Sequence, residues 1–340
     1  MKKGNLIREH WLDLAKGVAI IAVILQHSLQ RTTYFFNGMA EDNVLSFTSI
    51  ASWFISSVNM QWFFVISGYI YFAKQERYLS SPISFIKTRF VDLMIPYLLL
   101  GPLVWLGKYL LSAYVKNQVS FDDLLNMFIV PIAFMWFIYV LFYIEVIILL
   151  FDKLVRINYK YKLIILFVVY LVLALTTKYH KDVFWRVCFF SFWYYLGGAF
   201  YRYKAKIPQK TTFLSLLGGA IWLLSFGMSM ICARTIFCII WTFGSVLFIM
   251  MFFQNRQEIK GGNIALNFWG NKTMILYILN PIVLNGLKQV LLKLDLYNIS
   301  ICFFCFFVGT VLITSFIAYV VPKIPPVEFI FSPRKYIIKS

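Results

Sequence analysis

The sequence predicts an all-α membrane protein, a bundle of about ten transmembrane helices whose two termini both lie in the cytoplasm. Its 340 residues are 61% hydrophobic and only 14% charged, with a mean hydropathy of +0.76. A soluble domain could not keep its surface polar with this composition. Apolar runs of about 20 residues recur along the chain, and each is long enough to cross a hydrocarbon core of roughly 30 Å as a helix. A membrane β-barrel would show short alternating segments instead.

The apolar runs give the predicted membrane spans. They cover residues 11–29, 48–72, 90–114, 128–151, 163–177, 184–201, 211–231, 235–253, 272–292 and 299–321. The stretches between them are too short to bury a core of their own. We therefore expect residues 1–340 to form a single transmembrane domain, with no separate soluble domain.

The basic residues gather in alternate loops. The rich segments contain Lys2, Lys3 and Arg8; Lys74, Arg77, Lys87 and Arg89; Lys153, Arg156, Lys160 and Lys162; Arg202, Lys204, Lys206 and Lys210; Arg256 and Lys260; and Lys323, Arg334, Lys335 and Lys339. Short loops rich in Lys and Arg stay in the cytoplasm, so an even number of spans with both termini inside fits the whole pattern. The net charge of +18 is spread over these segments. Membrane lipids with anionic headgroups explain it, and no nucleic-acid partner is expected.

The five Cys residues all lie in or beside apolar runs. Cys302 and Cys305 have the spacing of a redox or zinc motif, but they stand among Phe residues in a predicted span with no further ligand nearby. We interpret them as packing residues and expect no metal site.

The first span carries three ionisable residues, Asp13, Lys16 and His27. Such residues are costly in a span and usually face the protein interior or a wet cavity. His27 follows Lys16 by about three helical turns plus 20°, so both lie on one face, roughly 16 Å apart along the axis. Asp13 lies one turn before Lys16 and joins the same face.

Two interpretations of this face remain open. In the first, His27 makes a hydrogen bond between helices and Lys16 extends to the headgroups. In the second, the cation at the cytoplasmic end and the imidazole deeper in the span bind a long substrate with an anionic head and a reactive tip. Acyl-coenzyme A has this shape, and an imidazole can remove the proton from an attacking hydroxyl near neutral pH.

A series of short motifs runs through most of the chain. They are Leu12-Asp13, Gly17, Ala19-Ile20 and His27 in the first span; Phe63-Phe64 ahead of Ser67-Gly68-Tyr69 in the second; Arg89 ahead of Pro96-Tyr97 in the third; Trp136-Phe137; Tyr195 ahead of Gly197-Gly198; and Trp269-Gly270-Asn271 ahead of Tyr277 and Asn280-Pro281. Together, and in this order, the motifs resemble those of acyltransferase family 3. The members of that family are polytopic membrane enzymes that acylate extracytoplasmic carbohydrates.

Three positions depart from the family pattern. Lys16 stands where the family usually has Arg, and so lacks the paired donors that Arg offers a phosphate. Asp92 stands where many members have a second basic residue before the Pro. Asn280 stands where many members have a His. Asn keeps the hydrogen bonding but cannot take up a proton, so we assign it to the pocket without an acid–base role.

Five further residues each have a functional interpretation and a plainer one, and for Arg89 the functional interpretation comes from the resemblance. Arg89 would contact the acyl donor, or it is an ordinary cytoplasmic charge. Ser67 and Tyr69 would line the pocket, and for Ser67 we favour helix packing over a covalent acyl intermediate. Glu145, a carboxylate near the middle of the fourth span, would orient His27 or pair with a basic group. Trp136 would stack on a sugar ring, or it belongs to the aromatic surface of the bundle.

We therefore expect a multi-pass O-acyltransferase of the bacterial inner membrane, most simply an O-acetyltransferase. It would transfer an acyl group from cytoplasmic acyl-CoA, with acetyl-CoA as donor substrate and no tightly bound cofactor, to a hydroxyl of an extracytoplasmic polysaccharide or lipid-linked sugar. His27 would act as general base or as transient acyl carrier, and Lys16 and Arg89 would hold the donor. A homo-oligomer is compatible with the sequence. The alternatives are a carrier or flippase for a lipid-linked or anionic solute, and an inactive relative that serves as a membrane partner.

Overall fold

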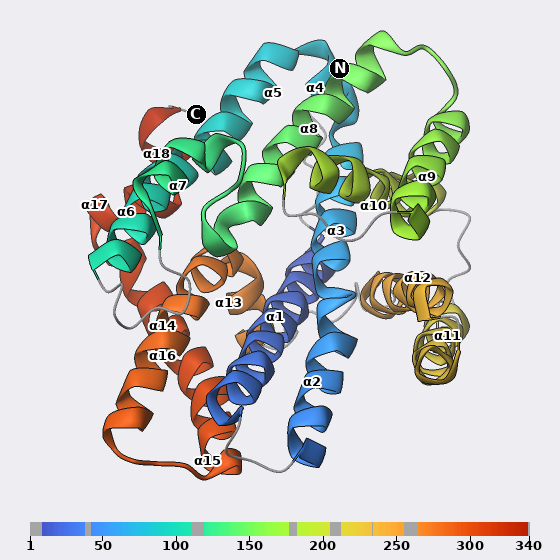
Figure 1. Cartoon of the computed structure of the whole chain (residues 1–340). Coiled ribbons are helices and arrows are strands. Elements are labelled where there is room, and N and C mark those ends of the chain that lie inside the picture. The colour runs from blue at the N-terminus through green and yellow to red at the C-terminus, as the bar shows by residue number, and fades with distance from the viewer. Residues whose placement is uncertain are drawn as a thin grey trace. The chain divides into compact units, whose positions relative to one another are not determined.

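The structure, a computed structural model, describes residues 9–37, 42–110, 119–176, 182–204, 212–232, 234–254 and 264–338. Within these ranges every regular element is helical and no strand occurs, which confirms the predicted all-α fold (Figure 1). The chain separates into two compact units. Unit 1 comprises Met1–Ile66 and Tyr203–Ala318, and unit 2 comprises Ser67–Arg202 and Tyr319–Ser340.

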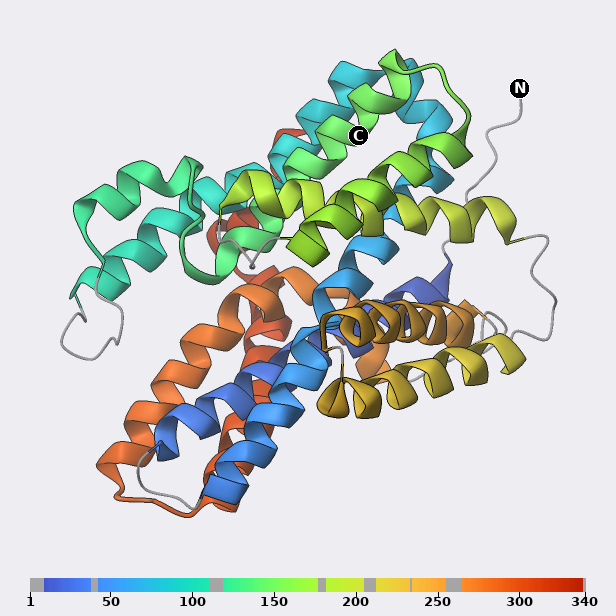
Figure 2. The same cartoon turned by 45° about the vertical axis from the view of Figure 1, so that its right-hand side comes forward.

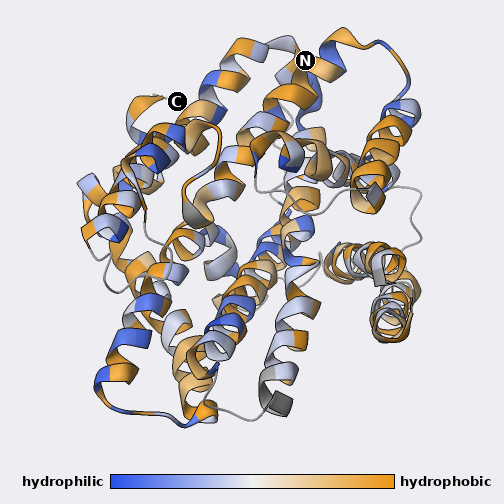
Figure 3. Ribbon diagram, in the orientation of Figure 1, coloured by the Kyte–Doolittle hydropathy of each residue, from blue (hydrophilic) through white to orange (hydrophobic). Residues whose placement is uncertain are grey.

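Eight helical segments of the described chain are long and apolar enough to cross a membrane. They are His10–Phe36, Ser46–Ala73, Pro82–Leu110, Tyr159–Thr176, Thr212–Ile231, Thr235–Gln254, Thr273–Lys293 and Ile299–Lys323. Hydrophobic residues cover most of these helices in Figure 3. Two further predicted spans coincide with helices α8 (Trp136–Leu154) and α10 (Val183–Tyr203), which bury several charged and polar side chains. The described helices define a polytopic membrane protein, whereas the ten crossings and the cytoplasmic termini stay predictions.

Helix α1 (His10–Phe36) is the central element of unit 1. It contacts α2 (Asp42–Ser56), α12 (Arg234–Gln254), α13 (Ile264–Asn271), α14 (Thr273–Lys293) and α15 (Ile299–Phe304). The π-helical turn η5 (Cys305–Gly309) and α16 (Thr310–Val320) continue α15, and α11 (Thr212–Ile231) packs along α12 (Figure 2). Because neighbours surround α1, more than half of its residues are buried.

Unit 2 begins within α3 (Asn59–Ala73), which enters it at Ser67. Its other elements are α4 (Gln75–Ser80), α5 (Pro82–Arg89), η1 (Phe90–Met94), α6 (Ile95–Leu110), α7 (Phe121–Leu125), η3 (Asn126–Phe128), η4 (Ala133–Met135), α8, α9 (Tyr159–Thr176), α10, η6 (Val321–Lys323), α17 (Pro325–Phe331) and α18 (Arg334–Ile337). The π-helical turn η1 joins α5 to α6 in one long helix. Single π-helical turns of this kind are frequent at functional sites.

Two predicted spans begin elsewhere than their apolar runs indicated. The fourth begins at Trp136 rather than Phe128, because Pro131 lacks the backbone N–H that a helix interior requires. The third begins at Pro82 rather than Phe90, because Pro suits a first helical turn and the polar segment after it continues the helix. Several predicted features lie outside the described residues. They are the span ends at Tyr114 and Thr177, the span start at Thr211, and the basic residues Lys2, Lys3, Arg8, Lys206, Lys210, Arg256, Lys260 and Lys339.

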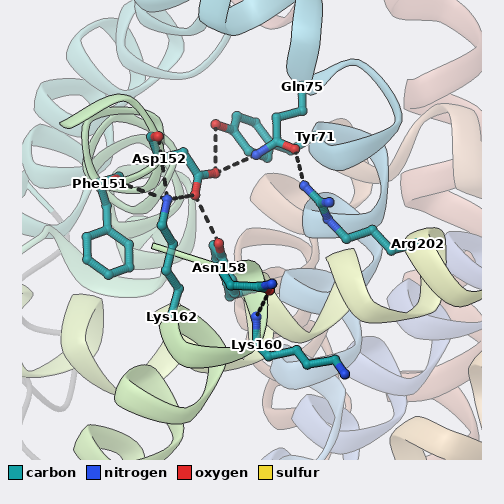
Figure 4. Close-up of polar contacts among 9 residues, drawn as sticks. Tyr71, Gln75, Phe151, Asp152, Asn158, Lys160, Lys162 and Arg202 are labelled. Atoms are coloured by element: carbon teal, nitrogen blue, oxygen red, sulfur yellow. Dashed lines mark hydrogen bonds and ion pairs between the residues drawn. The ribbon is translucent and has the colours of Figure 1, made fainter. Parts of the chain in front are cut away.

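A buried carboxylate, Asp152, joins helices α4, α8, α9 and α10 of unit 2 (Figure 4). Its Oδ1 accepts hydrogen bonds from Lys162 Nζ at 3.0 Å and from Tyr195 OH at 2.9 Å. Its Oδ2 accepts a hydrogen bond from Gln75 Nε2 at 2.8 Å, and Arg202 Nη2 donates to Gln75 Oε1 at 2.6 Å. The Asp152 and Lys162 side chains are only 3% and 6% exposed. Since each charge is buried against the other, the network fixes α4, α8, α9 and α10 at one end of the unit.

Replacement of Asp152 by Ala is expected to lower the free energy of unfolding by about 3–5 kcal/mol, because Lys162 would keep a buried charge without its counter-ion. Thermal unfolding of the detergent-solubilised protein measures the loss. Lys160→Ala, at an exposed position of the same α9 helix, is the matched control and should unfold like the wild type. An Asp152→Ala protein that unfolds at the wild-type temperature would show that the network does not stabilise unit 2.

Candidate active site

The Asp13–Lys16 pair lies near the first turn of α1 in unit 1. Lys16 Nζ is 2.7 Å from Asp13 Oδ1, and the two side chains are 25% and 7% exposed. Because α1 runs unbroken from His10 to Phe36, His27 lies on the same face roughly 16 Å further along the axis. The helix therefore presents a paired cation near one end and a half-buried imidazole deeper in the bundle.

Two glycines let α1 and α13 approach to backbone contact. A Cβ added to Gly17 would lie 2.3 Å from the backbone oxygen of Leu266, and one added to Gly270 would lie 1.8 Å from the backbone oxygen of Asp13. Neither oxygen belongs to a flexible side chain, so only Gly fits at these positions. Small residues permit such close helix crossings in membranes. The two motif glycines thus hold the segment that carries Lys16 against α13.

His27 is hydrogen-bonded to Asn280 of α14. His27 Nδ1 lies 2.6 Å from Asn280 Oδ1, and the Asn280 side chain is fully buried. The amide nitrogen of Asn280 donates to the backbone oxygens of Leu276 at 3.0 Å and Tyr277 at 2.7 Å. The oxygen of Tyr277 lacks its usual helical donor because Pro281, four positions later, has no N–H. Pro281 therefore leaves the carbonyl oxygen of Tyr277 available to accept the hydrogen bond that orients the Asn280 amide.

This network selects one form of the imidazole. The Asn280 nitrogen has two carbonyl acceptors, so its oxygen faces the ring and accepts a hydrogen bond from a protonated His27 Nδ1. The neutral ring then carries its lone pair on Nε2. That nitrogen can accept the proton of a hydroxyl group. Asn280 thus acts as a positioning residue for His27 without exchanging a proton itself.

A second group of charges lies in unit 2, at the junction of α5 and η1. Arg89 Nε is 3.0 Å from Glu145 Oε2, and the Glu145 side chain is 2% exposed. Arg89 Nη1 also lies 3.9 Å from Asp92 Oδ2. Tyr194 of α10 is a further buried neighbour of Glu145. The structure therefore contains the pairing of Glu145 with a basic group, which is one of the two interpretations of this residue.

The Ser67-Gly68-Tyr69 motif lies where α3 crosses α10. A Cβ added to Gly68 would lie 1.7 Å from the backbone oxygen of Tyr194. Tyr69 is fully buried, and its ring packs edge-on against Tyr201 with centroids 5.4 Å apart. The motif therefore forms a close helix contact at Gly68, whereas the packing role of Ser67 stays a prediction.

Trp136 lies at the first turn of α8 within an aromatic and cationic group. The guanidinium of Arg186 lies over its ring, 4.4 Å from the centroid, and the ring of Phe190 stacks on it at 5.5 Å. A cation over an indole face is a favourable contact in itself. A sugar that stacked on Trp136 would have to share the ring with these neighbours.

Arg334 joins the charges around Asp92, although from the sequence it was expected only to be a cytoplasmic charge. Its Nη1 lies 3.5 Å from Asp92 Oδ2, and α18 contacts η1. The only sequence signal was the excess of basic residues in both segments, because no motif links the C-terminal segment to the third span. Asp152 was missed as well, and its signal was a carboxylate at the end of an otherwise apolar run.

These features define the chain as a helical membrane protein with paired ionisable groups inside its helices, where such groups usually serve a function. Residues 9–320 match the family model described as an acyltransferase domain, Acyl_transf_3. The chain therefore belongs to acyltransferase family 3. Membership supports a membrane acyltransferase. No curated protein and no solved structure matches the chain.

Gly270→Ala is expected to lower the free energy of unfolding by about 1–3 kcal/mol, because the new methyl group would overlap the backbone oxygen of Asp13 and force α1 and α13 apart. Thermal unfolding in detergent measures this change. Gly286→Ala in α14 is the matched control, since a Cβ there meets no atom within 4 Å, and it should unfold at or slightly above the wild-type temperature. Equal stability of the two variants would contradict the backbone contact.

Proposed function

We propose that the chain is an O-acyltransferase of the bacterial inner membrane that moves an acetyl group from cytoplasmic acetyl-CoA to a hydroxyl of an extracytoplasmic polysaccharide or lipid-linked sugar. Membership in the family supports acyl transfer by a membrane protein. Beyond family membership, we propose that the transferred group is acetyl, that the donor is acetyl-CoA and that the acceptor is a sugar hydroxyl. In the predicted topology the Lys16 end of α1 is cytoplasmic, which suits a donor that enters from that side.

The observation that carries the proposal is the hydrogen bond between His27 and Asn280, which leaves Nε2 of the ring as the base. In the reaction the sugar oxygen attacks the carbonyl carbon of the thioester, so that a C–O bond forms and the C–S bond breaks. The hydroxyl proton passes to His27 Nε2 and then to the sulfur of the departing coenzyme A. Each transfer releases one free thiol and returns the ring to its neutral form.

Lys16 is proposed to contact the anionic part of the donor. Its ammonium lies near the N-terminal end of α1, where the helix dipole also favours anions. Asp13 orients this ammonium through their 2.7 Å contact. Arg89 is assigned to the same kind of ligand on the separate evidence of unit 2. There Glu145 contacts its Nε, Asp92 lies near its Nη1, and 21% of its side chain stays exposed.

His27→Ala is expected to lower acetyl transfer from acetyl-CoA by at least about 100-fold, because general-base catalysis typically contributes about 10²–10⁴ in rate. The assay follows radiolabelled acetyl groups into glycan with the purified protein. His10→Ala, an exposed His on the same helix, is the matched control and should keep full activity. Full activity of His27→Ala would remove the proposed mechanism.

Asn280→Ala is expected to lower kcat about tenfold with little change in KM for acetyl-CoA, because it removes one hydrogen bond that positions the base. A variant that is merely misfolded would instead lose thermal stability and donor binding together. Unchanged kcat in a folded Asn280→Ala protein would show that the amide does not position His27.

Lys16→Ala and Arg89→Ala are each expected to weaken acetyl-CoA binding about tenfold or more, since a charge-assisted hydrogen bond contributes about 1.5–3 kcal/mol. Isothermal titration of the purified protein measures the affinity. Arg156→Ala removes an exposed Arg from another predicted cytoplasmic segment and should bind normally. Because Arg89→Ala leaves Glu145 buried without its cation, Arg89→Lys is measured beside it. Unchanged affinity in both Ala variants would withdraw the donor role of these residues.

A further inference from the structure

The C-terminal helix brings a second guanidinium to the carboxylate of Asp92. Arg334 Nη1 and Arg89 Nη1 lie 3.5 Å and 3.9 Å from the same atom, Asp92 Oδ2. The Arg334 side chain is 55% exposed and that of Arg89 is 21% exposed, so part of each remains accessible. Two guanidinium groups are thus held side by side by one carboxylate, at the wide turn η1 of the third predicted span.

The position of Arg334 is fixed by contacts of its own short segment. Its neighbour Lys335 forms an ion pair with Glu328 of α17, and Tyr336 OH donates to Glu328 Oε2 at 2.8 Å. Helix α17 in turn contacts α6. These contacts hold α18 in place through two side chains, and Arg334 faces Asp92. The packing of α17 and α18 therefore fixes the position of the second guanidinium.

Lys74 follows α3 directly. It adds a positive charge to Arg89 and Arg334 that Asp92 and Glu145 do not balance. Burial lowers the pKa of the half-buried Lys74 ammonium, and the nearby guanidinium groups of Arg89, Arg334 and Arg77 lower it further. In the part of the chain that the structure describes, no carboxylate lies within ion-pair distance of Lys74. An excess of positive charge at a partly buried site costs free energy until an anion binds there.

We propose that Arg334, Arg89 and Lys74 form a binding site for phosphate groups, and that these are the phosphates of the coenzyme A donor. The inference rests on the proposed function, because it takes acyl-CoA as the donor. Guanidinium groups match phosphate oxygens with paired hydrogen bonds, and the ammonium of Lys74 adds a point charge. Arg334 lies beyond residues 9–320, so the C-terminal helix adds to the donor site a residue from outside the family domain.

The test compares Arg334→Ala, Arg334→Lys and Arg156→Ala in the purified full-length protein, reconstituted in nanodiscs of zwitterionic lipid. Isothermal titration with coenzyme A should show about tenfold weaker binding for Arg334→Ala and an intermediate affinity for Arg334→Lys, because a phosphate contact depends on charge and on the paired donors of Arg. Arg156→Ala removes an exposed Arg that has no part in holding Arg334, and it should bind with wild-type affinity. Turnover of acetylpantetheine, a donor without phosphates, should be the same in Arg334→Ala and in the wild type.

The outcomes separate this inference from the proposed function. If the wild type binds coenzyme A and Arg334→Ala binds it equally well, the site is overturned while the donor assignment stands. If the wild type binds no coenzyme A, the donor assignment fails and the site fails with it. Anionic lipid headgroups offer the same phosphate chemistry. Loss of phosphatidylglycerol retention in Arg334→Ala, with unchanged coenzyme A affinity, would therefore also overturn the proposal.

Discussion

Polar groups within the helices must find partners inside the protein, and this constraint organises the structure. Lipid offers no hydrogen bonds, so an unpaired charge or amide in a span is costly. Asp152 accordingly pairs with Lys162, and Glu145 pairs with Arg89. The amide of Asn280 bonds the carbonyl groups of its own helix and the imidazole of α1. The residues suited to chemistry are therefore also the residues that join distant helices.

The sequence allowed the helices to be predicted, because a long apolar run has one stable form in lipid. It also allowed Lys16 and His27 to be placed on one face, since both lie on the same unbroken helix. It did not locate the start of the third span, because Pro82 begins a helix well before the apolar run does. The π-helical turns η1 and η5 carry no sequence signal that distinguishes them from regular helix.

Partners across helices were harder to predict than positions along one helix. His27 and Asn280 were both named from sequence, yet their hydrogen bond depends on how α1 packs against α14. For the same reason the sequence did not decide whether Glu145 orients His27 or pairs with a basic group. The ion pair of Arg334 with Asp92 was not predicted, because Arg334 lies outside the family motifs and reaches Asp92 only through the packing of α17 and α18. The spacing of residues along the sequence shows which of them share a helix face. Which residues pair between helices depends on how the helices pack in three dimensions.

The missing N–H at Pro281 limits what position 280 can hold. A side chain there must donate to a backbone carbonyl and accept from an imidazole at the same time, which a carboxylate or an aliphatic chain cannot do. An amide meets both needs without gaining or losing a proton, so the ionisation of the pair resides in His27 alone. An imidazole at this position would instead couple two titrating rings. Asn280 therefore leaves the imidazole of His27 as the one titrating group of this hydrogen-bonded pair.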